Sequence, residues 1–293
     1  MAKGYTPGAD GTPYQTPDTE ERFTGILPQL LNPIDETEAN RLLNDSAFVM
    51  QQKFNGRRML IRKQEAAIHG INKKGLLIGL PESVFQDINA LPGNFILDGE
   101  CIGDVFHAFD LLVVNGGDSR SLPYRKRLTA LMNLLASAQH RFIKYANTAY
   151  SPEGKQDFLR KLQREQQEGV VFKRLDAPYT PDRPNSGGPQ LKHKFYATAS
   201  FIVWKVNTKR SVCLALWGTS RAHPPTSPAV QVTAGNVTIP PNHHIPKVGS
   251  VVEVRYLYAF KESGVIYQPV YLGLRADIDP SECRVEQLKY KPV

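Results

Sequence analysis

Cysteine is scarce in this sequence, and long hydrophobic runs are missing. The 293 residues include three cysteines, Cys101, Cys213 and Cys283, which lie far apart and form no C-x-x-C pair. This pattern disfavours both a disulfide framework and a zinc site. No apolar run approaches the roughly 18 residues of a membrane-spanning helix, and the first residues lack the apolar core of a signal peptide. We expect a cytoplasmic protein without membrane association.

Positive charge is what the composition has in excess. The chain has 36 Lys and Arg against 28 Asp and Glu, a formal net charge of +8. Such an excess suggests a polyanionic partner, most often a nucleic acid. The hydrophobic fraction of 41% is ordinary for a folded protein, which excludes a chain that is disordered throughout. Because a domain has roughly 100 to 200 residues, the length allows two domains.

Three regions are predicted from the distribution of apolar residues. Residues 1–24 are rich in Gly, Pro, Thr and Asp, which is typical of a flexible N-terminal arm. Residues 25–198 mix short strand-like segments with a few helices, an α+β pattern. Residues 199–293 contain only strand-like segments separated by Pro, Gly and Asn, which indicates a small β-barrel or sandwich.

Local signals predict individual elements within these regions. Asp35 or Thr37 is placed to cap a short helix. A second helix is expected over residues 125–140, and a third begins after Ser151, where Pro152 is allowed at the first helical position. The strand-like segments are FVMQQKF, RRMLIRK, AAIHGI, GLLIGL, SFIVWKV, SVCLALWG, AVQV, NVTI, SVVEVRYLYAF and VIYQPVYLGL. The segment RAHPPTSP reads as an exposed loop.

Five short motifs follow one another along the chain. In order they are K-x-x-G-x-R from Lys53 to Arg58, D-G-E from Asp98 to Glu100, F-D at Phe109-Asp110, E-G-x-x-x-K from Glu168 to Lys173, and L-K-x-K from Leu191 to Lys194. The first motif alone arises often by chance. Lys192 and Lys194 are two residues apart in a strand-like segment, so both side chains are expected on one face.

The order and spacing of these motifs resemble the covalent nucleotidyltransferase superfamily of ATP-dependent DNA ligases, RNA ligases and mRNA capping enzymes. The sequence is most similar to small ATP-dependent DNA ligases of bacterial or phage type. The resemblance implies a nucleotidyltransferase (ATP-grasp-like) adenylation domain over residues 25–198 and an OB-fold barrel domain over residues 199–293. It also implies a monomer in the cytoplasm of a bacterial or phage-infected cell.

The same resemblance implies the reaction. Lys53 would be adenylated by ATP with Mg²⁺ or Mn²⁺, and the AMP would pass to the 5′-phosphate at a nick in double-stranded DNA. The 3′-hydroxyl would then displace AMP. Since a free lysine has a pKa of about 10.4, few molecules carry the neutral amine near pH 7. Nearby cations would disfavour protonation and would also stabilise the charge that develops on the triphosphate.

The resemblance further assigns the site residues. Lys53, Lys192 and Lys194 are the catalytic residues, and Glu168 and Asp98 lie near the metal or the lysine. The residues expected to bind the nucleotide are Arg58 and Glu100 at the ribose, Phe109 at the adenine, and Glu168, Lys173, Arg183 and Arg275. Without the resemblance, Phe109 would read as a core residue, and the carboxylates as solvated strand ends.

Two positions depart from the family pattern. Asn55 stands where Asp is usual, which removes a carboxylate beside the nucleophile. In the last motif Arg275 and Asp277 are followed by Ile278 where the family has a lysine, so Arg275 is the main candidate for the pyrophosphate contact and Arg284 a possible substitute. Both departures predict slower self-adenylation.

Three alternatives stay open from the sequence. An RNA ligase or an mRNA capping guanylyltransferase would use the same lysine chemistry, the latter with GTP. An inert nucleic-acid-binding relative would explain the charge and the two departures. Several basic residues of the last region either contact DNA phosphates or are ordinary solvated charges. These are Lys205, Lys209, Arg210, Lys247 and Arg255.

Overall fold

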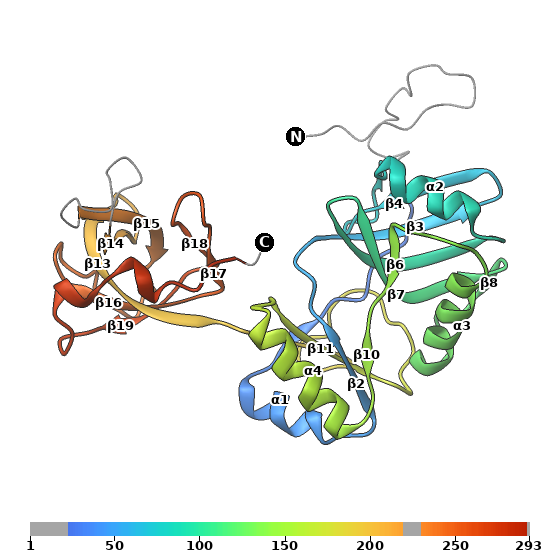
Figure 1. The fold of residues 1–293 in the computed structure, drawn as a ribbon, viewed down its shortest axis with the longest axis horizontal. Coiled ribbons are helices and arrows are strands. Elements are labelled where there is room, and N and C mark those ends of the chain that lie inside the picture. The colour runs from blue at the N-terminus through green and yellow to red at the C-terminus, as the bar shows by residue number, and fades with distance from the viewer. Residues whose placement is uncertain (1–22, 219–229, 292–293) are drawn as a thin grey trace, which may run out of the picture. The chain divides into compact units, whose positions relative to one another are not determined.

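The computed structural model describes residues 23–218 and 230–291. These residues divide into two compact units, one ending at His193 and the other beginning at Lys194 (Figure 1). The predicted N-terminal arm spans residues 1–24, of which residues 1–22 lie outside the described part of the chain. Phe23 forms a β-bridge with Leu76, and the Thr24 N–H donates a 2.8 Å hydrogen bond to the Gly75 carbonyl. The chain is therefore held in place from Phe23 onward.

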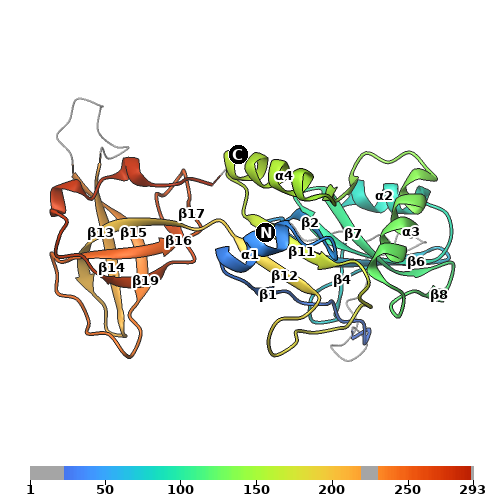
Figure 2. The ribbon, with the colours of Figure 1, turned by 90° about the horizontal axis from the view of Figure 1, so that it is seen from below.

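One sheet of the first unit has five strands, among them the strand that leads into Lys53 and the strand of the last lysine motif. Its strand order is β1-β12-β11-β2-β10. The strands are β1 (Asn32–Pro33), β12 (Gln190–Lys194), β11 (Gly169–Arg174), β2 (Phe48–Gln52) and β10 (Thr148–Ala149). Helix α4 (Pro152–Arg164) packs on β2, β10 and β11, and α1 (Glu36–Leu43) lies beside α4 (Figure 2).

The second sheet of this unit has seven strands and carries the D-G-E and F-D motifs. The order is β5-β4-β3-β6-β7-β8, and β9 also pairs with β7. The strands are β3 (Arg57–Gln64), β4 (Ala67–Ile71), β5 (Leu77–Ile78), β6 (Phe95–Ile102), β7 (Val105–Val114), β8 (Gly117–Asp118) and β9 (Ile143–Tyr145). Helices α2 (Glu82–Ala90) and α3 (Tyr124–Ala136) pack on this sheet and bury its main hydrophobic core.

The helix starts that the sequence signals are confirmed. Asp35 caps α1, where its Oδ1 accepts a 2.8 Å hydrogen bond from the Glu38 N–H. Ser151 caps α4 by accepting from the Gly154 N–H at 3.1 Å, and Pro152 is at the first turn. Helix α2 was not expected, because it is short and only Val84 and Ile88 of its residues are buried, which gives a weak helical pattern. None of the described helices is long and apolar enough to span a membrane.

Two buried lysines join helix ends to neighbouring chain segments. The Lys155 ammonium, on α4, donates to the carbonyls of Leu42, Asp45 and Phe48 at 2.9, 2.7 and 3.1 Å. These carbonyls lie where α1 ends and β2 begins. Lys63, on β3, does the same for three carbonyls at the end of α2. Because the last carbonyls of a helix lack partners within the helix, each lysine satisfies groups that would otherwise be buried unpaired.

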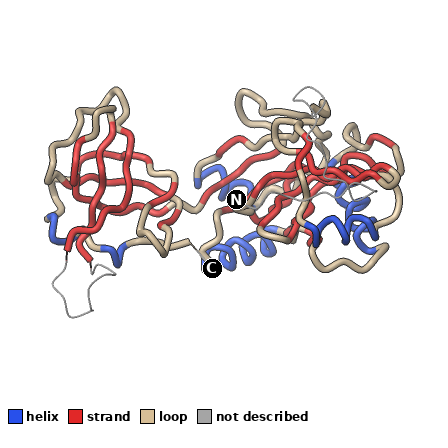
Figure 3. The backbone as a smooth tube through the Cα atoms, turned by 90° about the horizontal axis from the view of Figure 1, so that it is seen from above, coloured by secondary structure: helices blue, strands red, loops and turns tan. Residues whose placement is uncertain are grey.

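The second unit is built from strands, with helical structure among its described residues limited to two short 3-10 turns (Figure 3). An antiparallel sheet has the order β15-β14-β13-β16-β19. Its strands are β13 (Ala197–Val206), β14 (Ser211–Gly218), β15 (Val230–Thr238), β16 (Val251–Tyr256) and β19 (Val270–Leu274). Strands β17 (Tyr258–Ala259) and β18 (Ile266–Tyr267) pair with each other. The turns are η1 (Pro280–Glu282) and η2 (Val285–Gln287).

The strand content of this unit is as predicted, with two differences. The parts of the segments AVQV and NVTI that fall within Val230–Thr238 form the single strand β15, which has a register shift beside Gly235. Gly235 has a φ of +97°, a conformation that residues with a side chain rarely adopt. The strand pairings of the described residues do not close the sheet into a barrel, so an all-β unit is present but the OB-fold barrel is not confirmed. The predicted loop RAHPPTSP lies outside the described residues.

Candidate functional site

Four of the five motifs contribute to one pocket in the first unit. Lys53 directly follows β2, Arg58 is on β3, Glu100 on β6, Phe109 on β7 and Lys173 on β11. The lining residues are Leu31, Gln51, Gln52, Lys53, Phe54, Arg58, Glu100, Phe109, Val171, Lys173 and Gln190. The pocket encloses about 40 Å³, room for a few water molecules. A larger ligand would enter only when side chains in the pocket move.

Lys53 is held by a buried ion pair. Its Nζ lies 2.9 Å from Glu168 Oε1, and the two side chains are 18% and 5% exposed. The backbone repeats this pairing, since the Lys53 N–H donates to the Gly169 carbonyl at 2.9 Å. The end of β2 and the start of β11 are thus joined twice. Glu168 orients the amine and is placed to accept a proton from it.

The glycine of the first motif is required by a close approach to β6. A Cβ atom added to Gly56 would lie 2.4 Å from the Cys101 carbonyl oxygen, which no side chain tolerates. The Gly56 N–H donates to Glu100 Oε1 at 3.2 Å. Burial raises the pKa of the Glu100 carboxyl, against the opposing effects of Arg58 and Lys53. The loop after Lys53 is therefore fixed against the D-G-E strand.

Arg58 and Asp98 form a second buried ion pair. Both Arg58 Nε and Nη2 donate to Asp98 at 2.7 Å, a bidentate arrangement. Asp98 also accepts a 2.8 Å hydrogen bond from the Tyr179 hydroxyl, and Asp98 is fully buried. Since both carboxylate oxygens already accept bonds from protein donors, the assignment of Asp98 to a metal site stays a prediction.

The positively charged groups of two residues lie close to the ring of Phe109. The Arg58 guanidinium carbon is 4.5 Å from the centre of the ring, and Lys173 Nζ is 4.0 Å from it. Lys173 is 3% exposed, and burial lowers its pKa to about 7. The position of Lys173 against the ring suggests that it supports Phe109. Its predicted contact with the nucleotide is not tested by this geometry.

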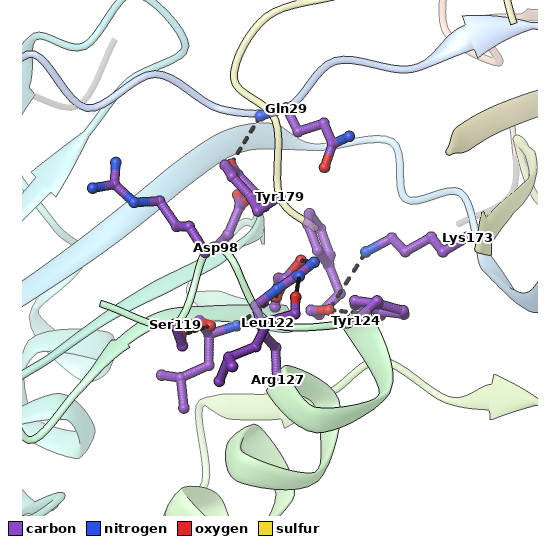
Figure 4. A network of polar contacts seen from close by, with 12 residues as sticks. Gln29, Asp98, Ser119, Leu122, Tyr124, Arg127, Lys173 and Tyr179 are labelled. Carbon is purple, nitrogen blue, oxygen red and sulfur yellow. Dashed lines mark hydrogen bonds and ion pairs between the residues drawn. The ribbon is translucent and has the colours of Figure 1, made fainter. Parts of the chain in front are cut away.

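The Phe109 carbonyl and Asp110 belong to a network of polar contacts. Tyr124, Arg127 and Lys173 of this network are labelled in Figure 4. The Tyr124 hydroxyl donates to the Phe109 carbonyl at 2.8 Å, and Lys173 Nζ lies 3.4 Å from the same carbonyl. Asp110, the second residue of the F-D motif, is fully buried and receives Nε and Nη2 of Arg127 at 2.8 and 3.0 Å. Asp110 thus anchors strand β7 to α3. Phe109 is held in place by the hydrogen bonds that its backbone carbonyl accepts.

The carboxylates of the pocket fit a hard divalent cation. Glu168 lies close enough to Glu100 that its charge also contributes, as a smaller effect than burial, to the raised pKa of Glu100. Magnesium prefers oxygen ligands and is usually held by one or two carboxylates together with substrate phosphates. No group of three or more His, Cys, Asp or Glu side chains arranged for a metal is found in residues 23–218 and 230–291. The donor set therefore suits a cation that arrives with a phosphate ligand.

The remaining predicted residues lie on other parts of the chain. Lys192 is half-buried on β12, whose backbone pairs with β1. Arg183 is exposed in the loop before β12. In the second unit, Lys194 donates to Gln268 Oε1 at 3.0 Å, and Arg275 pairs with Glu253 and Asp277. Their roles stay predictions.

The five basic residues considered for DNA are all exposed on the second unit. Two of them have partners within that unit. Arg210 Nη2 donates to the carbonyls of Pro240 and His243, which fixes a loop. The Arg255 guanidinium lies 4.9 Å from the centre of the Tyr196 ring. An exposed arginine beside an exposed aromatic ring is a combination that suits contacts with nucleic acid.

Sequence reasoning missed six residues that line the pocket, among them the apolar Leu31 and Val171. Phe54 packs with Phe109 and stacks on His107 at a ring distance of 4.2 Å. The other three are Gln51, Gln52 and Gln190. One signal was available for Gln190, which precedes Lys192 by two positions and so shares its face of the strand. The sequence carries no comparable signal for the others, because their exposure to the pocket depends on the turn after β2.

Three comparisons show what this chain is similar to. Residues 103–194 match the family model described as the ATP dependent DNA ligase domain. This range holds the last three motifs but not Lys53. A "Probable DNA ligase" of Dictyoglomus turgidum is 35% identical over 88 residues, which are 30% of this chain. The match spans only 15% of that relative's length.

Solved structures extend the likeness to both units. The ligase domain of LigD from M. tuberculosis has a TM-score of 0.51 at 19% identity and covers 88% of this chain and 98% of that one. A Lig E DNA ligase has a TM-score of 0.61 at 17% identity and covers 85% and 99%. At such identities the likeness shows the fold alone. The resemblance to ATP-dependent DNA ligases is confirmed, and the fold is the mixed α/β fold of ligase catalytic domains.

Proposed function

We propose that this protein is an ATP-dependent DNA ligase that seals nicks between a 5′-phosphate and a 3′-hydroxyl in duplex DNA. The observation that carries the proposal is the buried Lys53–Glu168 ion pair in a pocket formed by four of the predicted motifs. Residues 25–198 would be the adenylation domain and residues 199–293 an OB-fold domain. The localisation would be cytoplasmic, and the protein would act as a monomer.

In the first step Lys53 acts as the nucleophile. Its Nζ attacks the α-phosphorus of ATP, the new nitrogen–phosphorus bond forms, and the bond to pyrophosphate breaks. Lys53 must lose a proton before it attacks, and Glu168 Oε1 at 2.9 Å is placed to receive it. Lys192 and Lys194 would stabilise the charge on the α-phosphate, as fixed cations do in phosphoryl transfer.

The other pocket residues would bind the rest of the nucleotide. Phe109 would stack on the adenine, and Glu100 and Arg58 would hold the ribose hydroxyls. Since Arg58 and Lys173 now lie against the Phe109 ring, the base would enter as Arg58 moves aside. Arg183 and Arg275 would contact the leaving pyrophosphate. The Arg58–Asp98 pair would hold the pocket closed until a nucleotide is bound.

A divalent cation, Mg²⁺ or Mn²⁺, would be held by Glu168 together with the nucleotide phosphates. When bound, it neutralises the charge of the triphosphate. Glu100 is the carboxylate among the residues that line the pocket. Asp98 would become a ligand only if Arg58 and Tyr179 released its oxygens.

In the later steps the AMP moves from Lys53 to the 5′-phosphate, and the 3′-hydroxyl of the nick displaces it. Exposed basic residues of the second unit, Arg255 and Lys205 among them, would contact DNA phosphates and give affinity without sequence preference.

The test follows the label through the reaction. The purified chain is incubated with Mg²⁺ and ATP or GTP labelled at the α-phosphate, and nicked duplex DNA is then added. We expect covalent label from ATP, its loss on addition of the nick, and a sealed strand. Label from GTP alone would indicate a capping enzyme, sealing of RNA but not DNA would indicate an RNA ligase, and no label would indicate an inert relative.

A further inference from the structure

A buried amide in the pocket has one acceptor atom without a partner. Gln190, on β12, is 5% exposed and lines the Lys53 pocket. Its Nε2 donates a 2.9 Å hydrogen bond to Gln29 Oε1, but its own Oε1 has no hydrogen-bond partner among the described residues. Buried polar atoms in folded proteins almost always have partners. The unpaired oxygen therefore indicates that a ligand supplies the donor.

In the arrangement that the structure records, Gln190 Nε2 donates to Gln29 Oε1, which leaves Gln190 Oε1 as the free acceptor of this amide among the described residues. If the amide turned over, Gln190 Oε1 would face Gln29 Oε1, and two acceptors would meet. Gln29 is itself fixed at the backbone, because its N–H donates to the Tyr179 hydroxyl at 2.8 Å and its carbonyl accepts from Arg58 Nη2 at 3.3 Å. Gln29 is also 1% exposed, so its side chain has little freedom.

The other two glutamines of the pocket are already engaged with protein groups. Gln51 Nε2 donates to the Tyr124 hydroxyl at 3.0 Å and to Thr148 Oγ1 at 2.8 Å. Gln52 Nε2 donates to Gln167 Oε1 at 2.7 Å. Neither side chain has a buried atom without a partner in the described part of the chain. Gln190 is thus the amide of this pocket that is prepared for a ligand.

The position of Gln190 suits the base of a nucleotide. It shares a strand face with Lys192, which the proposed function places at the α-phosphate, and it lies one strand step farther along that face. Phe109 lines the same pocket and offers a ring for stacking. Adenine presents an amino group at position 6, a hydrogen-bond donor, whereas guanine presents an oxygen there, an acceptor.

We propose that Gln190 Oε1 accepts a hydrogen bond from the 6-amino group of the bound purine and thereby selects adenine over purines that lack this group. The inference rests on the proposed function, since it needs a nucleotide in the pocket. A 6-oxo purine would place two acceptors together in a buried site, and a purine with hydrogen at position 6 would leave the Gln190 oxygen unpaired.

The test compares ATP with purine riboside 5′-triphosphate, whose base carries hydrogen in place of the amino group. The concentration for half-maximal labelling of Lys53 is measured for the wild-type chain and for Gln190→Met. We expect the wild type to prefer ATP by roughly tenfold, the effect of one buried hydrogen bond. In Gln190→Met the preference should fall to about 1, through weaker use of ATP and unchanged use of the analogue.

A further variant controls for a general effect of removing a glutamine. Gln86→Met, an exposed glutamine on α2, should keep the wild-type preference. A preference equal to the wild type in Gln190→Met would overturn the inference while leaving the proposed function intact.

A second comparison of nucleotides tests whether the hydrogen-bond donor to Gln190 belongs to the base or to the ribose. The preference for ATP over 2′-deoxy-ATP should be the same in the wild type and in Gln190→Met. If Gln190→Met loses that preference instead, the acceptor serves the ribose hydroxyl and the inference is wrong. If the wild-type chain takes no label from any nucleotide, the proposed function fails, and the inference fails with it.

Discussion

The first unit buries lysine side chains in two different ways. Lys63 and Lys155 are each surrounded by three backbone carbonyls, which use all the donors of the ammonium group. Lys53 and Lys173 face the pocket and have fewer close partners, a carboxylate for Lys53 and an aromatic ring for Lys173.

The difference teaches which lysines can react. An ammonium with three fixed carbonyl partners has no donor to release and serves the fold. A lysine with a single carboxylate can pass its proton to that group, and a lysine held against a ring sits where its charge is costly. The burial of a lysine is therefore not a sign of function by itself. What matters is whether its partners complete its hydrogen bonds.

Among changes to these lysines and their partners, removal of the proposed nucleophile should have the largest effect on labelling. Lys53→Ala should abolish covalent labelling by ATP, because no other group takes its place opposite Glu168. The change also takes the cation away from the buried Glu168 carboxylate, so the melting temperature should fall, and labelling is therefore scored per folded molecule. The measurement is the labelled fraction by gel autoradiography together with a melting curve. Labelling that persists in this variant would show that another residue is the nucleophile.

Removing the proton acceptor should have the next largest effect. Glu168→Gln keeps the size of the side chain and its contact with Lys53 but loses the base, so the rate of lysyl-AMP formation should fall by about 100-fold. Single-turnover labelling over a pH series measures this rate. Glu165→Gln, an exposed change at the end of α4, is the matched control and should label at the wild-type rate.

A structural lysine should show the opposite behaviour. Lys155→Met leaves three buried carbonyls without a donor and should lower the free energy of unfolding by about 2 to 4 kcal/mol. Labelling per folded molecule should be retained. Lys161→Met, on the exposed side of the same helix, is the control and should be within about 0.5 kcal/mol of the wild type. Equal effects of the two changes in urea unfolding would contradict the role assigned to Lys155.

The last effect, the smallest when stated per pH unit, is a pH dependence of stability from Lys173. Burial lowers its pKa to about 7, well below the value of the unfolded chain. Between pH 7 and about pH 10 the unfolded chain binds one more proton, so stability rises with pH by up to about 1.4 kcal/mol per unit, and the cost of the buried charge is fully present below pH 7. Lys173→Met should remove this slope. A difference between variant and wild type that is constant from pH 7 to 9 would show that Lys173 does not titrate there.

Much of the fold and of the site follows from local patterns. The caps at Asp35 and Ser151 predicted two helix starts, and alternation of apolar residues predicted most strands. The motifs named Lys53, Glu100, Phe109 and other pocket residues in advance. Helix α2 was missed because only two of its residues, Val84 and Ile88, are buried, which leaves a weak helical pattern in the sequence. The merging of AVQV and NVTI into β15 was missed because Gly235 looks like a turn residue but allows a register shift.

The sequence by itself determined the chemistry of this protein: a lysine, carboxylates, an aromatic ring and further cations, in an order that matches one kind of reaction. Only the tertiary structure decided which of them meet. It placed Glu168 at 2.9 Å from Lys53 and gave Asp98 to Arg58. It also left the Gln190 oxygen buried with no hydrogen-bond partner within residues 23–218 and 230–291. Residue types set what a side chain can do, but strand register and burial set what it touches, and these depend on segments far apart in the chain.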